Sequence, residues 1–139
     1  MKCGCKRLWV CIAFLGATLG LLYLSSTPRL GDKLPLKPET PRSVQVKFFN
    51  EDKSTSEFKL CAEVVAALRD SRGGGPPCLC PPLGSIILQY ADGETNKLYL
   101  QPGHWIGRTD VIFDGRRYSM ATGKLSHTIK NLGIQMNFK

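Results

Sequence analysis

Three cysteines between residues 61 and 80 are the side chains whose reactions can best be predicted from the sequence. Cys61 falls on an expected helix, and Cys78-Leu79-Cys80 lies in a loop bounded by prolines. In an oxidising compartment such thiols tend to pair. We expect one disulfide, from Cys61 to Cys78 or to Cys80, which would stabilise the fold by about 3 kcal/mol in the chain-entropy model. The cysteine left over is either a free, partly buried thiol or the partner in the intermolecular bridge of a homodimer.

A metal or redox role for these cysteines is not expected. Zinc sites use CxxC-like pairs together with a second pair or with histidines at a set spacing. Here one residue separates Cys78 from Cys80, and the two histidines, His104 and His127, are isolated. The pair could exchange disulfides, but no basic side chain that would activate a thiolate stands beside it in the sequence. We therefore expect no metal and no cofactor.

Catalytic motifs are absent from the sequence. There is no GxSxG, Walker loop, GxGxxG, HExxH or kinase motif, and no Asp-x-Asp pair for sugar-nucleotide transfer. Most acids near the expected strands are assigned to turns, where Asp is chosen for backbone geometry: Asp92, Glu94, Asp110 and Asp114. His104 beside Trp105 could line a ligand pocket, but we favour packing of the aromatic ring on the sheet. The chain is not expected to be an enzyme.

The elements that must carry these residues begin with a membrane anchor. Residues 1–7 carry three basic side chains and no acid, and residues 8–28 carry no charge. About 20 apolar residues cross a bilayer as a helix. The run is longer than the core of a secretory signal peptide and lacks a clean cleavage site, so we favour an uncleaved anchor over a cleaved signal. The dense N-terminal charges favour a cytosolic tail at 1–7 and a type II orientation.

Two features of the tail and anchor suggest further membrane chemistry. Cys3 and Cys5 precede the apolar run on its cytosolic side, where cysteines are candidates for S-palmitoylation. The alternative is two unmodified thiols. Gly16 and Gly20 form a GxxxG, a spacing that lets two membrane helices approach closely and dimerise.

A proline-rich segment follows the anchor. Residues 25–42 contain four prolines, which remove backbone donors and favour extended neighbours. We assign residues 29–42 to an extended, semi-rigid stem. A short tail, one helix and a proline-rich stem resemble the layout of type II proteins of the Golgi and cell surface, glycosyltransferases included. The resemblance covers only the first 42 residues and implies a luminal or extracellular domain at 43–139.

That domain is predicted to be α+β, with one helix on a mainly antiparallel sheet. Strands are expected at 44–48, 86–90, 97–101, 109–113 and 117–120, with hairpin turns at Asp92-Gly93 and Asp114-Gly115. Residues 128–138 alternate loosely and are expected to continue the run of strands. Ser54 and Glu57 form a capping box that opens the helix. Its apolar face is Cys61, Val64, Val65 and Leu68, and it is expected to end at the glycines of 73–75.

The charge distribution suggests a class of partner. The chain has a net charge of +8, and no acid follows Asp114. The basic residues of this last segment that could form an anion-binding surface are Arg116, Arg117, Lys124 and Lys130. The alternative is a solvated basic face. Nucleic acid is excluded for a luminal domain.

Together these features predict a single-pass type II membrane protein in the Golgi or at the cell surface. Its small domain is expected to bind a protein or an anionic glycan without catalysis, as a monomer or a homodimer. Two alternatives stay open. The first is a secreted or shed signalling ligand, and the second is an accessory or fragment of a Golgi glycan-modifying enzyme.

Overall fold

The computed structural model describes Thr18 and residues 30–134. The expectations for the anchor at 8–28, for Cys3 and Cys5 and for Gly16 and Gly20 lie outside these residues. Within the described part of the chain, no helix combines the length and the apolar character needed to span a membrane.

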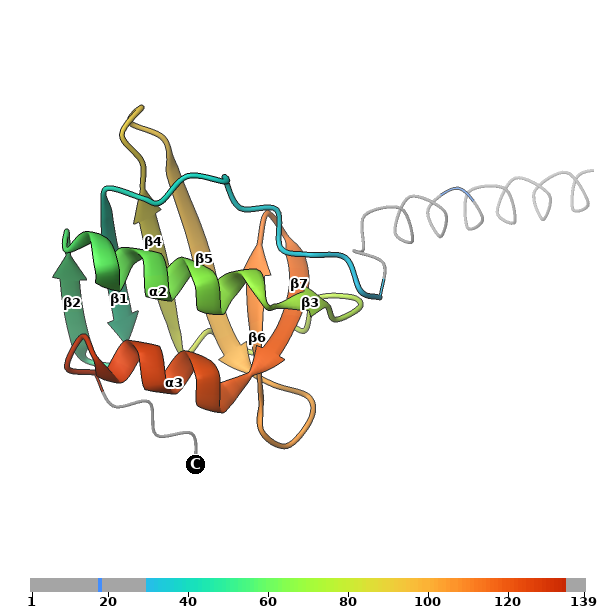
Figure 1. The fold of residues 1–139 in the computed structure, drawn as a ribbon. Helices are drawn as coiled ribbons and strands as arrows, with labels where there is room; N and C mark the ends of the chain where they lie inside the picture. The colour runs from blue at the N-terminus through green and yellow to red at the C-terminus, as the bar shows by residue number, and fades with distance from the viewer. Residues whose placement is uncertain (1–17, 19–29, 135–139) are drawn as a thin grey trace, which may run out of the picture.

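Seven strands form one sheet in the order β2-β1-β4-β5-β6-β7-β3 (Figure 1). Every neighbouring pair is antiparallel, which confirms the predicted mainly antiparallel sheet. The strands are β1 (Ser43–Phe48), β2 (Glu51–Thr55), β3 (Arg72–Gly73), β4 (Gly84–Gln89), β5 (Thr95–Pro102), β6 (Arg108–Phe113) and β7 (Arg116–Ala121).

Two helices cover one face of this sheet, whereas the sequence interpretation expected one (Figure 1). Helix α2 spans Phe58–Arg69 and helix α3 spans Thr122–Lys130. The alternation noted after residue 128 was misleading, because Leu125 and Ile129 are four residues apart and both are buried. Spacing of three and four is the helical signal. Residues 128–130 therefore belong to a helix and not to a strand, and the part of the expected strand beyond residue 134 lies outside the described residues.

The core lies between the helices and this face of the sheet. Alternate residues of β1, β4, β5 and β7 point into it and are fully or almost fully buried, as the period of two requires. The predicted apolar face of α2 is confirmed, since Cys61, Val64, Val65 and Leu68 are all buried. The largest buried side chains are Tyr118, Phe48, Leu68, Ile86, Leu88, Leu98, Leu100, Met120, Leu125, Ile129 and Ile134.

Both predicted hairpins form. Strand β4 pairs with β5 across the Asp92-Gly93 turn, and β6 pairs with β7 across Asp114-Gly115. Asp114 has φ 50° and Gly115 has φ 69°. Left-handed φ at both central residues is the requirement of the tight hairpin turns that match strand twist.

The predicted capping box is wrong. Ser54 lies in β2, and the residue before α2 is Glu57, which makes no side-chain cap. Strand β2 was missed because its sequence, Glu51–Thr55, is polar and its residues are mostly exposed. An edge strand of this kind shows no alternation of apolar and polar residues. Helix α2 also ends earlier than expected, and Gly73 pairs in β3 rather than stopping the helix.

The expected stem is in large part a piece of the domain. Leu34 is buried in the core, Gly73 donates its backbone N–H to the carbonyl of Asp32, and Lys33 bridges to Arg72. Further on, Arg69 donates to the carbonyl of Lys37 at 2.7 Å. Residues 32–42 therefore pack on the domain instead of forming a free spacer.

Lys37 links this segment to the β4–β5 turn through ion pairs. Its ammonium group pairs with Asp92 and with Glu94 and lies 5.1 Å from the centre of the Tyr90 ring. The hydrogen bonds that Lys37 donates to Asp92 and then to Glu94 raise the pKa of Lys37, and the same bond lowers the pKa of Asp92. These groups are exposed, so their contribution to stability is small.

The close approach of β1 and β4 depends on Gly84. A Cβ atom at this position would lie 2.2 Å from the carbonyl oxygen of Lys47. We expect Gly84→Ala to destabilise the domain by about 1 to 3 kcal/mol, because the strands must separate to admit the methyl group. Thermal unfolding followed by circular dichroism measures the change.

Gly123 provides the matched control. It lies in α3, and a Cβ there meets nothing within 4 Å. Gly123→Ala is expected to leave the unfolding temperature unchanged or to raise it slightly, because Ala favours a helix over Gly by up to about 1 kcal/mol. Equal loss of stability in both variants would contradict the packing at Gly84.

Candidate functional site

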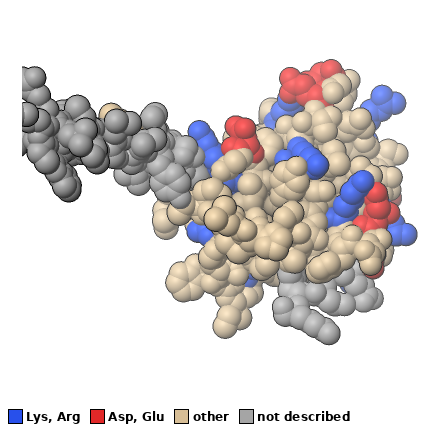
Figure 2. All heavy atoms as spheres, turned by 180° about the vertical axis from the view of Figure 1, so that it is seen from behind, with Lys and Arg blue, Asp and Glu red and all other residues tan. Residues whose placement is uncertain are grey.

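The face of the sheet opposite the helices carries the candidate site. Residues in register along one row of this face come from three adjacent strands, Lys47 of β1, Ser85 of β4 and Tyr99 of β5. The row continues to Ile112 and Arg117 on β6 and β7. Figure 2 views this side of the molecule, where the lower part around the β5–β6 connection is largely uncharged.

A loop covers one end of this face. Residues 74–83 connect β3 to β4 and contact β5 and β7 on the way. Gln101 donates to the carbonyl of Cys80, and Arg117 donates to the carbonyl of Gly74. Gln101 is buried, and the side chain of Arg117 is 13% exposed. The loop therefore shields a polar cluster at the end of β5, β6 and β7.

The centre of that cluster is Asp110, whose side chain is only 3% exposed. Its Oδ2 lies 2.7 Å from Nδ1 of His104 and 3.5 Å from Nη1 of Arg117. Nη1 of Arg117 is also 2.8 Å from Nδ1 of His104. A guanidinium can only donate and an ionised carboxylate can only accept, so Nδ1 of His104 can pair with one of the two but not with both. We assign a proton to Nδ1, which then donates to Asp110, and Arg117 takes Asp110 rather than the ring as its acceptor. We name His104, Asp110 and Arg117 the buried triad after its buried centre, Asp110; the His104 side chain is 41% exposed.

Two atoms beside the triad have no hydrogen-bond partner among the described residues. They are Oε1 of Gln101 and Nε of Arg117, and both are buried. A buried acceptor or donor without a partner costs about 1 to 3 kcal/mol. Buried polar atoms without partners are rare, and each one in a native structure calls for an explanation such as a binding role or a bound water. Both of these atoms lie in the small region under the loop.

The cysteines do not pair as the sequence interpretation expected. Cys78 is bonded to Cys80, with 5.2 Å between their Cα atoms, and Cys61 is a free, buried thiol. Cys61 faces the core from α2, where burial raises the pKa of its thiol. A buried thiol is not available to a second chain, so among these three cysteines the structure offers no group for the intermolecular bridge.

The sequence reasoning missed most of this cluster. Asp110 was assigned to a turn but lies inside β6. The Cys78–Cys80 pair was said to lack a basic neighbour, yet a ring nitrogen of His104 lies within 4.8 Å of both sulfurs. One signal was available: Asp110 lies inside the strand predicted at 109–113, directly before three apolar residues, where a charge needs a partner.

Exposed apolar side chains surround the cluster. Leu79, between the paired cysteines, is 104% exposed, and Trp105 and Ile106 in the β5–β6 connection are 77% and 106% exposed. These two loops lie close together, since a ring nitrogen of His104 is within 4.8 Å of the two sulfurs. The predicted packing of Trp105 on the sheet is therefore wrong. We call these three side chains the apolar loop patch.

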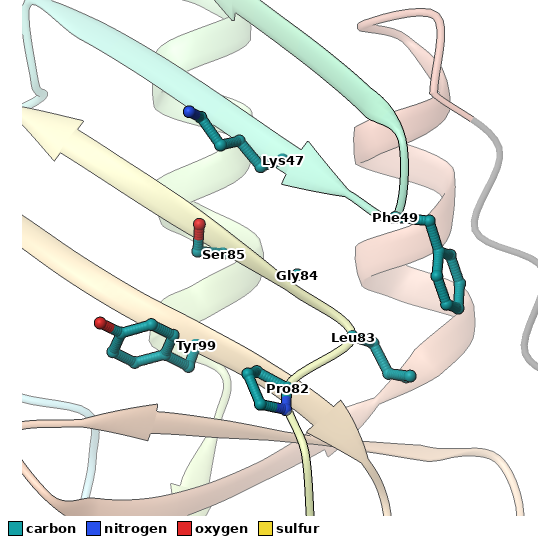
Figure 3. A pocket seen from close by; sticks show the side chains of 7 residues that line it. All are labelled: Lys47, Phe49, Pro82, Leu83, Gly84, Ser85 and Tyr99. Atoms are coloured by element: carbon teal, nitrogen blue, oxygen red, sulfur yellow. The ribbon is translucent and has the colours of Figure 1, made fainter.

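A shallow hollow of ≈ 310 Å³ lies further along the same face (Figure 3). Lys47, Ser85 and Tyr99 present polar groups from adjacent strands, and Phe49 and Leu83 stand at one end. Lys47 pairs with Asp52 at 3.2 Å, which neutralises its charge. The hollow can accept a small polar group but presents no free cation.

The four basic residues proposed as an anion-binding surface are placed on different parts of the domain. Arg117 belongs to the buried triad on the helix-free face, and Arg116 lies at the β6–β7 turn. Lys124 and Lys130 lie on α3, which covers the opposite face, and Lys124 pairs with Asp70. Arg117 therefore cannot act together with the two lysines.

Comparison of the chain with protein-family models, curated proteins and solved structures gives no match.

The cysteine arrangement predicts a definite count of reactive thiols in a chain that starts at Leu30. Without reductant, the folded domain should react with Ellman's reagent at no thiol, because Cys61 is buried and the other two are paired. In guanidinium one thiol should react, and after reduction three. A bridge from Cys61 would instead leave Cys78 or Cys80 reactive in the folded domain.

The buried triad predicts a large effect of removing its negative charge. Asp110→Asn leaves Arg117 without a charged acceptor and should cost about 1 to 3 kcal/mol of folding free energy. Asp114→Asn is the matched control, since Asp114 is exposed at a left-handed turn position that Asn adopts readily. Urea unfolding measures both. A loss no larger than that of the control would show that Asp110 is not the centre of the cluster.

Proposed function

We propose that this chain is a single-pass type II membrane protein of the secretory pathway whose luminal or extracellular domain binds a protein partner without catalysis. The observation that carries the binding proposal is the apolar loop patch. Three large apolar side chains, Leu79, Trp105 and Ile106, are exposed to solvent on two neighbouring loops, in which Cys78, Cys80 and His104 bring side-chain atoms within 4.8 Å of one another.

An exposed patch of this kind is costly unless something covers it. Burying apolar surface contributes about 25 cal/mol per Å², and clusters of exposed apolar side chains mark interaction sites. Trp is also the residue type most enriched among those that dominate binding energy. The patch has a polar surround in Arg108, which is exposed and donates to Ser119. An apolar centre with a polar rim is the usual anatomy of a protein interface.

A protein partner fits better than an anionic glycan. Two of the four residues predicted to bind an anion already have acceptors, Lys124 with Asp70 and Arg117 with Asp110. Each pair would have to open before its cation could bind a sulfate or carboxylate. The apolar loop patch needs no such rearrangement.

The packed stem favours a partner close to the membrane. Five residues lie between Pro28, the end of the proposed anchor, and Leu34 in the core, and the six steps from one Cα atom to the next span at most about 20 Å. The domain would thus stand beside the bilayer surface. In the alternative of a shed ligand, the cut would fall before Asp32, because the chain beyond it is packed on the domain.

Absence of catalysis is proposed from the state of the cysteines. The thiolate that His104 could activate does not exist while Cys78 and Cys80 are bonded to each other. Nδ1 of His104 is held by Asp110, so the ring serves first as part of the buried triad.

The test is affinity capture from cells with the parent chain and two variants. Trp105→Ala removes the largest side chain of the patch and should weaken capture of a specific partner by about 2 kcal/mol, or roughly 30-fold in Kd. Phe58→Ala is the matched control, because Phe58 is 72% exposed on α2, at the start of the helix layer.

The partner should be captured equally by the parent and by Phe58→Ala. Equal capture by Trp105→Ala would contradict docking at the loops. Retention of the parent on heparin near physiological salt, with no change in Trp105→Ala, would favour the anionic glycan instead.

A further inference from the structure

We propose that Cys78, Cys80 and His104 form a redox-gated site for a thiophilic divalent cation such as Zn²⁺. In the oxidised chain the two sulfurs are bonded to each other, and in the reduced chain they bind the cation together with the imidazole. One potential ligand atom from each of the three residues lies within 4.8 Å of the other two.

The distances suit a tetrahedral ion. Zn–S bonds of about 2.3 Å place two thiolate sulfurs about 3.8 Å apart, and Zn–N bonds are about 2.0 Å. The Cα atoms of Cys78 and Cys80 are 5.2 Å apart, so side-chain rotation can open the sulfurs to this spacing. The backbone need not move far, and a ring nitrogen of His104 lies within 4.8 Å of both sulfurs.

The surroundings of His104 are those of a metal ligand. Histidines that bind metals commonly donate the other ring N–H to a carboxylate, which fixes the tautomer and the ring orientation. With the Nδ1 proton of His104 donated to Asp110, the lone pair of the ring is on Nε2, where it is available to a cation. Asp110 is itself buried and held by Arg117, so this support is rigid.

An independent observation points to a missing polar group at the same place. Oε1 of Gln101 is buried without a partner, and Nε2 of the same side chain donates to the carbonyl of Cys80. A cation with three protein ligands keeps a water in its fourth position. That water would give Oε1 of Gln101 the donor it lacks.

Charge and redox balance are both met. Two thiolates neutralise one divalent cation, and Asp110 is neutralised by Arg117, so the loaded site is neutral. Opening the site requires an external thiol or phosphine: two equivalents of a monothiol reduce the S–S bond to two S–H groups and form one new disulfide. Binding of the cation then releases the two thiol protons to solvent.

The test uses the full-length chain in detergent with Co²⁺ as the probe. Cys3 and Cys5 are replaced by Ser, because they also form a CxC. After reduction with a phosphine and anaerobic transfer, Co²⁺ should give a thiolate-to-cobalt charge-transfer band that saturates at one ion per chain and that Zn²⁺ abolishes. The chain before reduction should give no band.

Variants assign the ligands. His104→Ala should weaken Co²⁺ binding by at least tenfold, and Cys80→Ser should remove most of the band. His127→Ala is the control, since His127 lies on α3 and should leave binding unchanged. Circular dichroism shows that each variant is folded, and Asp110→Asn should weaken binding by about 10- to 100-fold through the orientation of His104.

Absence of the band in the reduced chain would overturn the proposal. An undiminished band in folded His104→Ala would overturn it as well, because it would place the ion on thiolates alone. The result does not depend on the docking proposal, since capture of a protein partner through Trp105 is measured separately.

Discussion

One-sided burial is the constraint on which the rest of this structure depends. Both helices and the segment around Leu34 pack on a single face of the seven-stranded sheet, so the core is a single layer between them. The other face must then be polar or be covered by something else. At the β1–β4–β5 end it stays open and polar, and at the β5–β6–β7 end residues 74–83 cover it.

The covering loop encloses charge rather than apolar surface. Two charged groups taken out of water are costly unless each finds close partners, and Asp110 finds them in Arg117 and His104. Arg117 also donates to the carbonyl of Gly74, so the same side chain that neutralises Asp110 holds the loop in place. The position of Cys78 and Cys80 follows from this anchoring, as does the exposure of the apolar side chain between them.

The proposals for docking and for metal binding concern the same pair of loops but rest on different atoms. Docking rests on the exposed side chains of Leu79, Trp105 and Ile106, and the cation site rests on the sulfurs and the imidazole beneath them. A disulfide and a bound cation would both tie the loops together. The redox state would therefore decide whether a disulfide or a bound cation holds the loops that carry the apolar loop patch.

The sequence by itself determined the local features of this domain. Alternation predicted β1, runs on either side of Asp-Gly dipeptides predicted β4, β5, β6 and β7 as two hairpins, and spacing of three and four predicted the buried face of α2. These signals work because they arise from neighbouring residues, as backbone geometry repeats within a few positions. The edge strand β2 has no alternation of apolar and polar residues, so no local pattern predicted it. Helix α3 did carry one, in the spacing of Leu125 and Ile129, and it was overlooked.

Only the tertiary structure decided the candidate site and the extent of the domain. His104, Asp110 and Arg117 look unrelated in the sequence, and β-sheet pairing brings them together beside Cys78 and Cys80. Leu34 likewise reads as part of a proline-rich spacer until the core that buries it is formed. Contacts between residues distant in the chain depend on which strands pair and which loop covers them, and no local pattern encodes that arrangement.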